Sequence, residues 1–145
     1  MRKGHLKRVC VIDGQGGGIG ATIIKYLKRA YGESLELIAL GTNAIAAAEM
    51  LRAGANRAAS GENAIVRTAA TADAIVGPVA IGWAHAMLGE ITPKMAEAVT
   101  ASPAPKVLLP LSQEPVVIVG VVSEPLPHLV QELVNKKIRE VLGDV

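Results

Sequence analysis

The sequence predicts a single α/β domain, residues 1–145, built on a mostly parallel sheet of five to six strands with helices on both faces. Three observations predict this class. Half of the 145 residues are hydrophobic, which suffices for one domain with its own core. Short apolar runs typical of buried strands alternate with longer segments of helical periodicity. A glycine-rich stretch, residues 13–20, joins the first of these runs to the first helical segment.

The first half of the chain is expected to contain four strands and three helices in alternation. Parallel strands buried on both faces read as short continuous apolar runs, and helices as longer stretches with apolar residues three or four apart. Gly32 and Gly54 are expected to end the first two helices. The predicted strands cover residues 9–12, 37–40, 57–60 and 74–76, and the predicted helices cover residues 18–31, 44–53 and 63–70.

The second half of the chain is less regular. Residues 79–88 fit more than one kind of element, and Gly89 as a C-terminal stop favours a helix. Thr92-Pro93 predicts a helix start, with threonine as N-cap and proline at the first position. A loop is expected over residues 101–105. Two further strands, 107–109 and 116–119, are too close together for a crossover and are expected to form an antiparallel edge pair. The final helix is expected over residues 126–142.

Composition argues against several classes of function. A net charge of only +2 and three aromatic residues do not suit a nucleic-acid binder, which needs basic excess and stacking surfaces. No apolar run approaches the roughly 20 residues of a membrane helix, so no membrane association is expected. The single cysteine, Cys10, cannot form an internal disulfide, which favours the cytoplasm.

The glycine-rich loop carries the clearest functional signal. Five of its residues 14–20 are glycine, which leaves backbone N–H groups unobstructed at the start of a helix. This arrangement favours a bound phosphate, so a nucleotide is the expected ligand. Ala21 stands where a phosphate-binding NTPase loop needs lysine, which argues against that class.

The spacing Gly14-x-x-x-Gly18-Ile19-Gly20 resembles the glycine turn of short-chain dehydrogenases/reductases, and it makes NAD(P) the expected cofactor. The catalytic Tyr-x-x-x-Lys of that family is absent, so its reductase activity does not carry over. Asp13-x-Gln15-x-x-Gly18 is also similar to a cobalamin-binding pattern, but glutamine replaces the histidine that ligates cobalt.

Over nearly its whole length the sequence also resembles an uncharacterised bacterial family known only as a domain of unknown function. The matching segments are residues 11–20, 39–44, 61–64 and 87–92. This resemblance implies a Rossmann-like three-layer fold and no established activity.

Later strand ends are expected to extend the site, because loops after parallel strands emerge at one edge of the sheet. A short repeat supports this expectation, since Gly41-Thr42-Asn43-Ala44-Ile45 recurs as Gly61-Glu62-Asn63-Ala64-Ile65. The same repeat also fits two similar helix caps. The candidate ligand-binding residues are Asp13, Gly14, Gln15, Gly16, Gly17, Gly18, Ile19, Gly20, Gly41, Thr42, Asn43, Gly61, Glu62, Asn63, Gly77 and Pro78.

Several roles remain open on the sequence alone. Asp13 fits a magnesium ligand or a base, but capping of the glycine loop is the commoner use of such an aspartate. Glu62 fits the ligand-binding edge or an exposed first helical turn. The whole protein fits an enzyme acting with a nucleotide, or a regulatory or structural module without catalysis that is either nucleotide-sensing or ligandless. A homodimer is expected, because the predicted edge pair and residues 79–88 leave apolar surface to cover.

Overall fold

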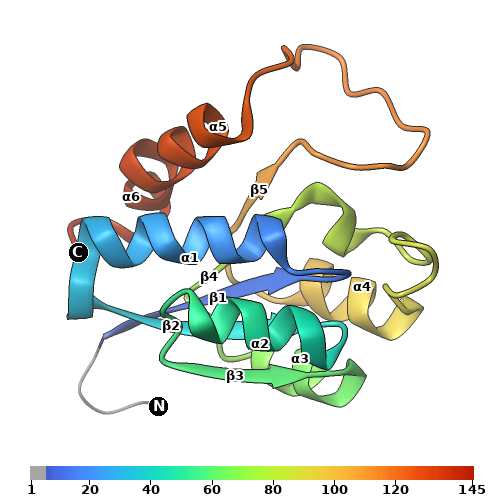
Figure 1. Ribbon diagram of the computed structural model, residues 1–145, viewed down its shortest axis with the longest axis horizontal. Coiled ribbons are helices and arrows are strands. Elements are labelled where there is room, and N and C mark those ends of the chain that lie inside the picture. Colours follow the sequence, from blue (N-terminus) through green and yellow to red (C-terminus); the bar gives the residue numbers. More distant parts are fainter. Residues whose placement is uncertain (1–5) are drawn as a thin grey trace.

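The computed structural model describes residues 6–145 and shows five parallel strands in the order β3-β2-β1-β4-β5 (Figure 1). Strand β1 lies in the centre and pairs with both β2 and β4. The predicted α/β class is confirmed, and the arrangement is that of a Rossmann-like three-layer fold. The strands are β1 (Lys7–Asp13), β2 (Leu35–Gly41), β3 (Arg57–Ser60), β4 (Ala74–Pro78) and β5 (Lys106–Leu109).

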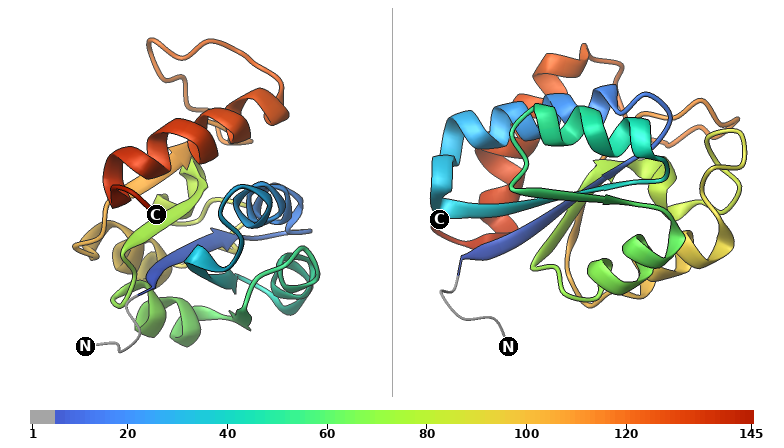
Figure 2. Two further views of the ribbon diagram at one scale, coloured as in Figure 1. Left: turned by 90° about the vertical axis from the view of Figure 1, so that its left-hand side faces the viewer. Right: turned by 60° about the horizontal axis from the view of Figure 1, so that its bottom comes forward.

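Helices cover both faces of the sheet (Figure 2). One face carries α1 (Gly18–Tyr31), α2 (Ala44–Arg52) and the C-terminal helix, which runs through α5 (Leu126–Glu132), a π-helical turn η3 (Leu133–Lys137) and α6 (Ile138–Leu142). The other face carries α3 (Glu62–Ala69) and α4 (Pro93–Ala101). Short 3₁₀ turns, η1 (Gly32–Ser34) and η2 (Val79–Gly82), complete the described elements. No helix within residues 6–145 is long and apolar enough to cross a membrane.

Alternation along the central strand explains the two cores. Val9 and Val11 are buried against α1 and the C-terminal helix, whereas Cys10 and Ile12 are buried on the side of α3 and α4. A strand covered on both faces must be apolar at every position, which is why this run lacks polar alternation. The C-terminal helix is fixed in place by Tyr31, whose hydroxyl donates to the carbonyl of Val134 at 2.5 Å.

Two helix starts follow the chemistry that the sequence predicts. The Asn43 side chain accepts from the N–H of Ala46 at 2.9 Å and caps α2. Thr92 caps α4 by accepting from the N–H of Met95 at 3.2 Å. The second copy of the repeat differs, because Gly61 rather than Asn63 is the N-cap of α3.

The helix expected over residues 79–88 is wrong beyond its first turn. Only η2 is helical, and the chain then makes a series of tight turns. His85, Met87 and Leu88 have left-handed backbone angles (φ of 72°, 59° and 57°), which no α-helix contains. A local hydrogen bond from the N–H of His85 to the carbonyl of Ile91 at 2.6 Å closes this turn, and the N–H of Met87 donates to Glu114 of a distant segment at 2.9 Å.

The sixth strand expected over residues 116–119 is also wrong, and so is the antiparallel edge pair. These residues belong to a long projecting loop between β5 and α5 (Figure 1), and β5 is the last strand of the sheet. Their strong β-propensity finds no neighbouring strand to pair with. Val117 and Val119 are 92% and 96% exposed. Strand propensity without a hydrogen-bonding partner does not make a strand.

Because all five strands are parallel, their carboxyl ends lie at one edge of the sheet. The strand order reverses between β1 and β4, since β2 and β3 lie to one side of β1 while β4 and β5 lie to the other. Open α/β sheets bind ligands outside the carboxyl ends of their strands at such a reversal. The glycine loop begins at this point.

Candidate functional site

Asp13, the last residue of β1, organises the glycine loop from inside. One carboxylate oxygen accepts from the N–H of Gly14 at 2.8 Å, and the other accepts from the N–H of Gly20 at 2.7 Å. These bonds tie the first and last glycines together, which bears out the capping role. Burial raises the pKa of Asp13, and the two hydrogen bonds offset the rise only in part. The neighbouring carboxylate of Glu90 raises it further.

Three glycines of the loop are closely packed against other parts of the chain. A Cβ on Gly14 would lie 2.6 Å from the sulfur of Met87, and one on Gly20 would lie 2.5 Å from the sulfur of Met50. Gly17 has a left-handed φ of 75°, and its Cβ would lie 2.8 Å from the backbone of Ala46. Gly17 therefore excludes a side chain whether or not a ligand binds, whereas a side chain at Gly14 or Gly20 would require neighbouring side chains to move.

Gly16 and Gly18 differ from those three. Both are exposed, and a Cβ built on either would meet nothing within 4 Å. Neither has a left-handed φ. Within residues 6–145, no hydrogen bond occupies the backbone N–H of either residue. The fold itself thus gives no reason for glycine at these two positions.

A carboxylate that sequence reasoning missed closes one flank of the loop. A single Glu90 oxygen accepts from the N–H of Gln15 at 2.8 Å, the hydroxyl of Thr42 at 2.6 Å and the side-chain amide of Asn43 at 3.0 Å. Burial alone would raise the pKa of Glu90, but these hydrogen bonds outweigh it and hold the pKa below its ordinary value. Glu90 therefore links the loop after β1 to the loop after β2.

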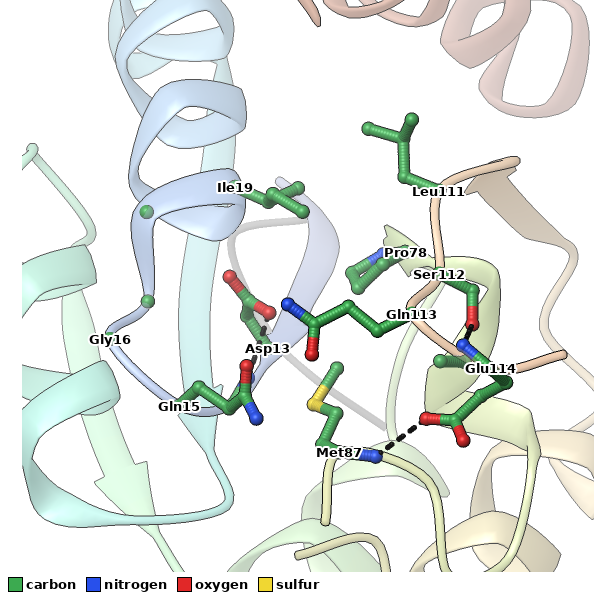
Figure 3. A pocket seen from close by; sticks show the side chains of 14 residues that line it. Asp13, Gln15, Gly16, Ile19, Pro78, Met87, Leu111, Ser112, Gln113 and Glu114 are labelled. Carbon is green, nitrogen blue, oxygen red and sulfur yellow. Dashed lines mark hydrogen bonds between the residues drawn. The ribbon is translucent and has the colours of Figure 1, made fainter.

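The other flank opens into a cavity of about 440 Å³ at the strand-order reversal (Figure 3). This volume lies in the range of small-molecule sites. The glycine loop forms one wall, the end of β4 contributes Pro78, and the segment Leu111–Glu114 forms the opposite wall. The lining residues are Asp13, Gly14, Gln15, Gly16, Gly17, Gly18, Ile19, Pro78, Ala80, Met87, Leu111, Ser112, Gln113 and Glu114.

The wall opposite the glycine loop is pinned by its own hydrogen bonds. Glu114 accepts from the N–H of Met87 at 2.9 Å, and its own N–H donates to the hydroxyl of Ser112 at 2.9 Å. Gln113 points from this wall across the cavity toward Asp13 (Figure 3). Within residues 6–145, no group of three His, Cys, Asp or Glu side chains is arranged to hold a metal ion.

The structure brings only part of the predicted site to the cavity. Residues 13–19 and Pro78 line it. Gly20, Gly41 and Gly77 instead allow close packing, against Met50, Ala47 and the Ile12 carbonyl respectively.

The remaining predicted residues are occupied elsewhere or lie away from the cavity. Thr42 and Asn43 bond to Glu90 at the closed flank. Glu62 accepts from the Thr92 hydroxyl at 2.6 Å. Asn63 is exposed on α3. Gly61 adjoins Gly41, to whose carbonyl its N–H donates at 2.9 Å.

The residues that sequence reasoning missed come from two segments that it assigned to other structures. Met87 lies in the stretch expected to be helical, with Glu90 just beyond it, and Leu111–Glu114 lies between the two strands of the expected edge pair. Residues 87–92 were already among the segments matched to the uncharacterised family, which was the one available signal. Nothing in the local sequence around Gln113 pointed to the cavity.

The fold and the cavity define a single α/β domain with a candidate small-molecule site at the strand-order reversal. The chain belongs to a family described as a domain of unknown function (DUF3842), whose model matches residues 8–142. This finding confirms the resemblance to an uncharacterised family. A search of curated proteins finds no match to the chain.

Proposed function

We propose that the protein binds a nucleotide whose phosphate is held by the Gly14–Gly20 loop, with NAD(P) as the cofactor that the sequence favours. One observation carries this proposal. Gly16 and Gly18 are exposed, no contact within the described residues requires glycine at either position, and both line the cavity. Glycine loses more conformational entropy on folding than any other residue, so its presence at two positions that do not need it calls for another reason. A bound phosphate supplies that reason, because it must come close to the backbone N–H groups.

The electrostatics of the cavity define how an anion would be held. Its described lining contains no lysine or arginine, while Asp13 and Glu114 contribute carboxyl groups. Backbone N–H groups and the positive end of the α1 dipole would therefore provide the attraction. Fixed dipoles at close range are screened less by salt than exposed charges, so we expect only a shallow salt dependence of the affinity.

Titration calorimetry with NAD, NADP, ATP and FMN tests the proposal. Wild-type protein should bind at least one of them, and Gly18→Val should abolish binding while the protein stays folded. Gly82→Ala is the control, because Gly82 does not line the cavity and its Cβ would make only an ordinary 3.4 Å contact. Mass spectrometry of small molecules released from purified protein should identify the ligand. Absence of binding to every nucleotide would overturn the proposal.

The two carboxylates of the cavity already accept hydrogen bonds from backbone N–H groups, and this favours a nucleotide-sensing module without catalysis over an enzyme. Both Asp13 oxygens accept loop N–H groups, and one Glu114 oxygen accepts the N–H of Met87. Groups committed to holding loops in place are poorly disposed to act as bases. Turnover of NAD(P)H or ATP in the presence of a metabolite panel would contradict this choice. A cytoplasmic location, favoured by the single cysteine, belongs to the same proposal.

We also propose a homodimer, on a surface different from the one that the sequence suggested. Residues 79–88 are partly buried, but six large hydrophobic side chains between Val116 and Val122 are exposed on the projecting loop. An exposed patch of this kind marks an interaction surface. Light scattering at micromolar concentration should give twice the monomer mass, and Val117→Asp with Val119→Asp should give the monomer. A wild-type monomer would contradict the proposal.

A further inference from the structure

The two flanks of the glycine loop differ in how much room they leave for a ligand. On the flank toward β2, Glu90 bonds to Gln15, Thr42 and Asn43, and its carboxylate would lie 2.9 Å from a Cβ on Gly14. Dinucleotide-binding sheets place the ribose of one nucleotide at this end of the second strand. Here the chain's own side chains fill that place, and no residue of 41–43 lines the cavity.

The flank toward β4 and β5 offers a surface suited to one flat, partly polar group. Ile19, Pro78 and Leu111 present apolar atoms around the opening, and Figure 3 shows all three facing the same space. Gln113 reaches into that space and carries both donor and acceptor groups. Binding sites of this size combine apolar walls with a few polar groups that fix orientation.

The closed flank and the opposite wall are mechanically joined. Glu90 lies three residues after Met87, whose N–H bonds to Glu114 on the wall that carries Gln113. Met87 itself lines the cavity and packs over Gly14. Opening the β2 flank to admit a second nucleotide would therefore disturb the wall that holds the first one.

We infer, on the basis of the proposed function, that the site takes a mononucleotide rather than a dinucleotide. The phosphate lies at Gly16 and Gly18, the nucleoside lies over Pro78 and Leu111, and Gln113 hydrogen-bonds to the polar edge of the nucleoside. Glu90 excludes a second nucleotide from the end of β2. The inference keeps the proposed nucleotide and its phosphate site, but it replaces NAD(P), the dinucleotide that the sequence favours, with the class of nucleoside monophosphates.

Calorimetry on the wild-type protein decides between the two ligand classes. The probes are AMP, nicotinamide mononucleotide, FMN and NAD. We expect at least one mononucleotide to bind, and NAD to bind no more tightly than the better of its two halves. If NAD binds more tightly than both halves, the second nucleotide has contacts of its own, which overturns the inference while the proposed function stands. If no probe binds, the inference fails, and the proposed function fails with it when NADP and ATP do not bind either.

Two variants test the assigned groups. Gln113→Ala should weaken mononucleotide binding about tenfold, the scale of one or two lost hydrogen bonds. Gln131→Ala, at an exposed position on α5, is the matched control and should leave the affinity unchanged. Unchanged binding by Gln113→Ala would overturn the assigned orientation.

Glu90→Ala should raise the affinity for NAD relative to its halves, because it empties the β2 flank. A fall in the affinity for NAD alone would make Glu90 a ribose ligand and overturn the inference. Circular dichroism checks that the variant is folded. If Glu90→Ala does not fold, the inference is still tested by the affinities of wild-type protein for NAD and its two halves, and by the comparison of Gln113→Ala with Gln131→Ala.

Discussion

The two sides of one glycine loop are used in opposite ways. Toward β2 the loop is bonded to its own chain through Glu90, which accepts from the N–H of Gln15 and from the side chains of Thr42 and Asn43. Toward β4 it faces a cavity, and Gly16 and Gly18 have open space where a side chain would stand. A glycine motif indicates that other atoms approach the backbone closely. The motif alone does not distinguish the atoms of a ligand from those of the protein itself.

Substitution of the packed and the open glycines should give the largest contrast. Gly17→Val should lower the free energy of unfolding by about 2–5 kcal/mol, because valine adds a left-handed backbone penalty to a clash with Ala46. Gly18→Val, one residue away, should leave stability nearly unchanged. Chemical denaturation of both variants measures the difference. Equal losses of stability would show that the two kinds of glycine do not differ.

Asn43 tests the closed flank at a smaller scale. Its side chain caps α2 and bonds to Glu90 and the carbonyl of Gln15, so the chain already uses its hydrogen-bonding groups. If Asn43 were the ligand-binding residue that the sequence also allows, its loss would cost roughly 1–2 kcal/mol of affinity. We expect Asn43→Ala instead to cost about 1 kcal/mol of stability, as a lost cap does, with nucleotide affinity unchanged.

Thermal unfolding and calorimetry on the same Asn43→Ala preparation separate these outcomes. Asn63→Ala is the control, because Asn63 occupies the corresponding position of the repeat but is exposed and caps nothing. A weaker affinity with an unchanged melting temperature would place Asn43 in the ligand site and open the flank that we consider closed.

The smallest expected effect is the pH dependence that Asp13 contributes. Its pKa is raised in the folded protein, so the folded state holds this proton more tightly than the unfolded state. The contribution of Asp13 to stability is therefore full below its unfolded-state pKa and is lost as pH rises through the raised value. Asp13→Asn does not titrate, so wild type should lose stability relative to the variant as pH increases.

Melting temperatures of wild type and Asp13→Asn between pH 4 and 8 test this sign. The difference in melting temperature between the two proteins isolates the contribution of Asp13. Glu36 and Glu90 have lowered pKa values, so their contributions to stability increase as pH rises, in both proteins. Asp144→Asn, at an exposed position near the C-terminus, is the control. A difference that moves the other way with pH would show that Asp13 is stabilised as the anion.

The sequence by itself determined the elements whose signals are local. Continuous apolar runs identified β1, β2 and β4, because a strand between two helical layers must be apolar on both sides. Helical periodicity identified α1 and the C-terminal helix. Cap chemistry located the starts of α2 and α4 at Asn43 and Thr92. Proximity of the strand ends then followed from parallel topology alone.

Tertiary structure decided the features that depend on partners distant in sequence. Residues 116–119 have the composition of a strand but lack a neighbour, and the left-handed turns at His85, Met87 and Leu88 are joined to a distant segment by the hydrogen bond from the N–H of Met87 to Glu114. The N–H of Gln15 donates to Glu90 across 75 positions, and Gln113 lines the same cavity as the glycine loop although nearly 100 positions separate them in the sequence. Hydrogen bonds between such distant residues leave no periodicity in the chain, so only the folded arrangement shows which flank of the loop is closed and which is open.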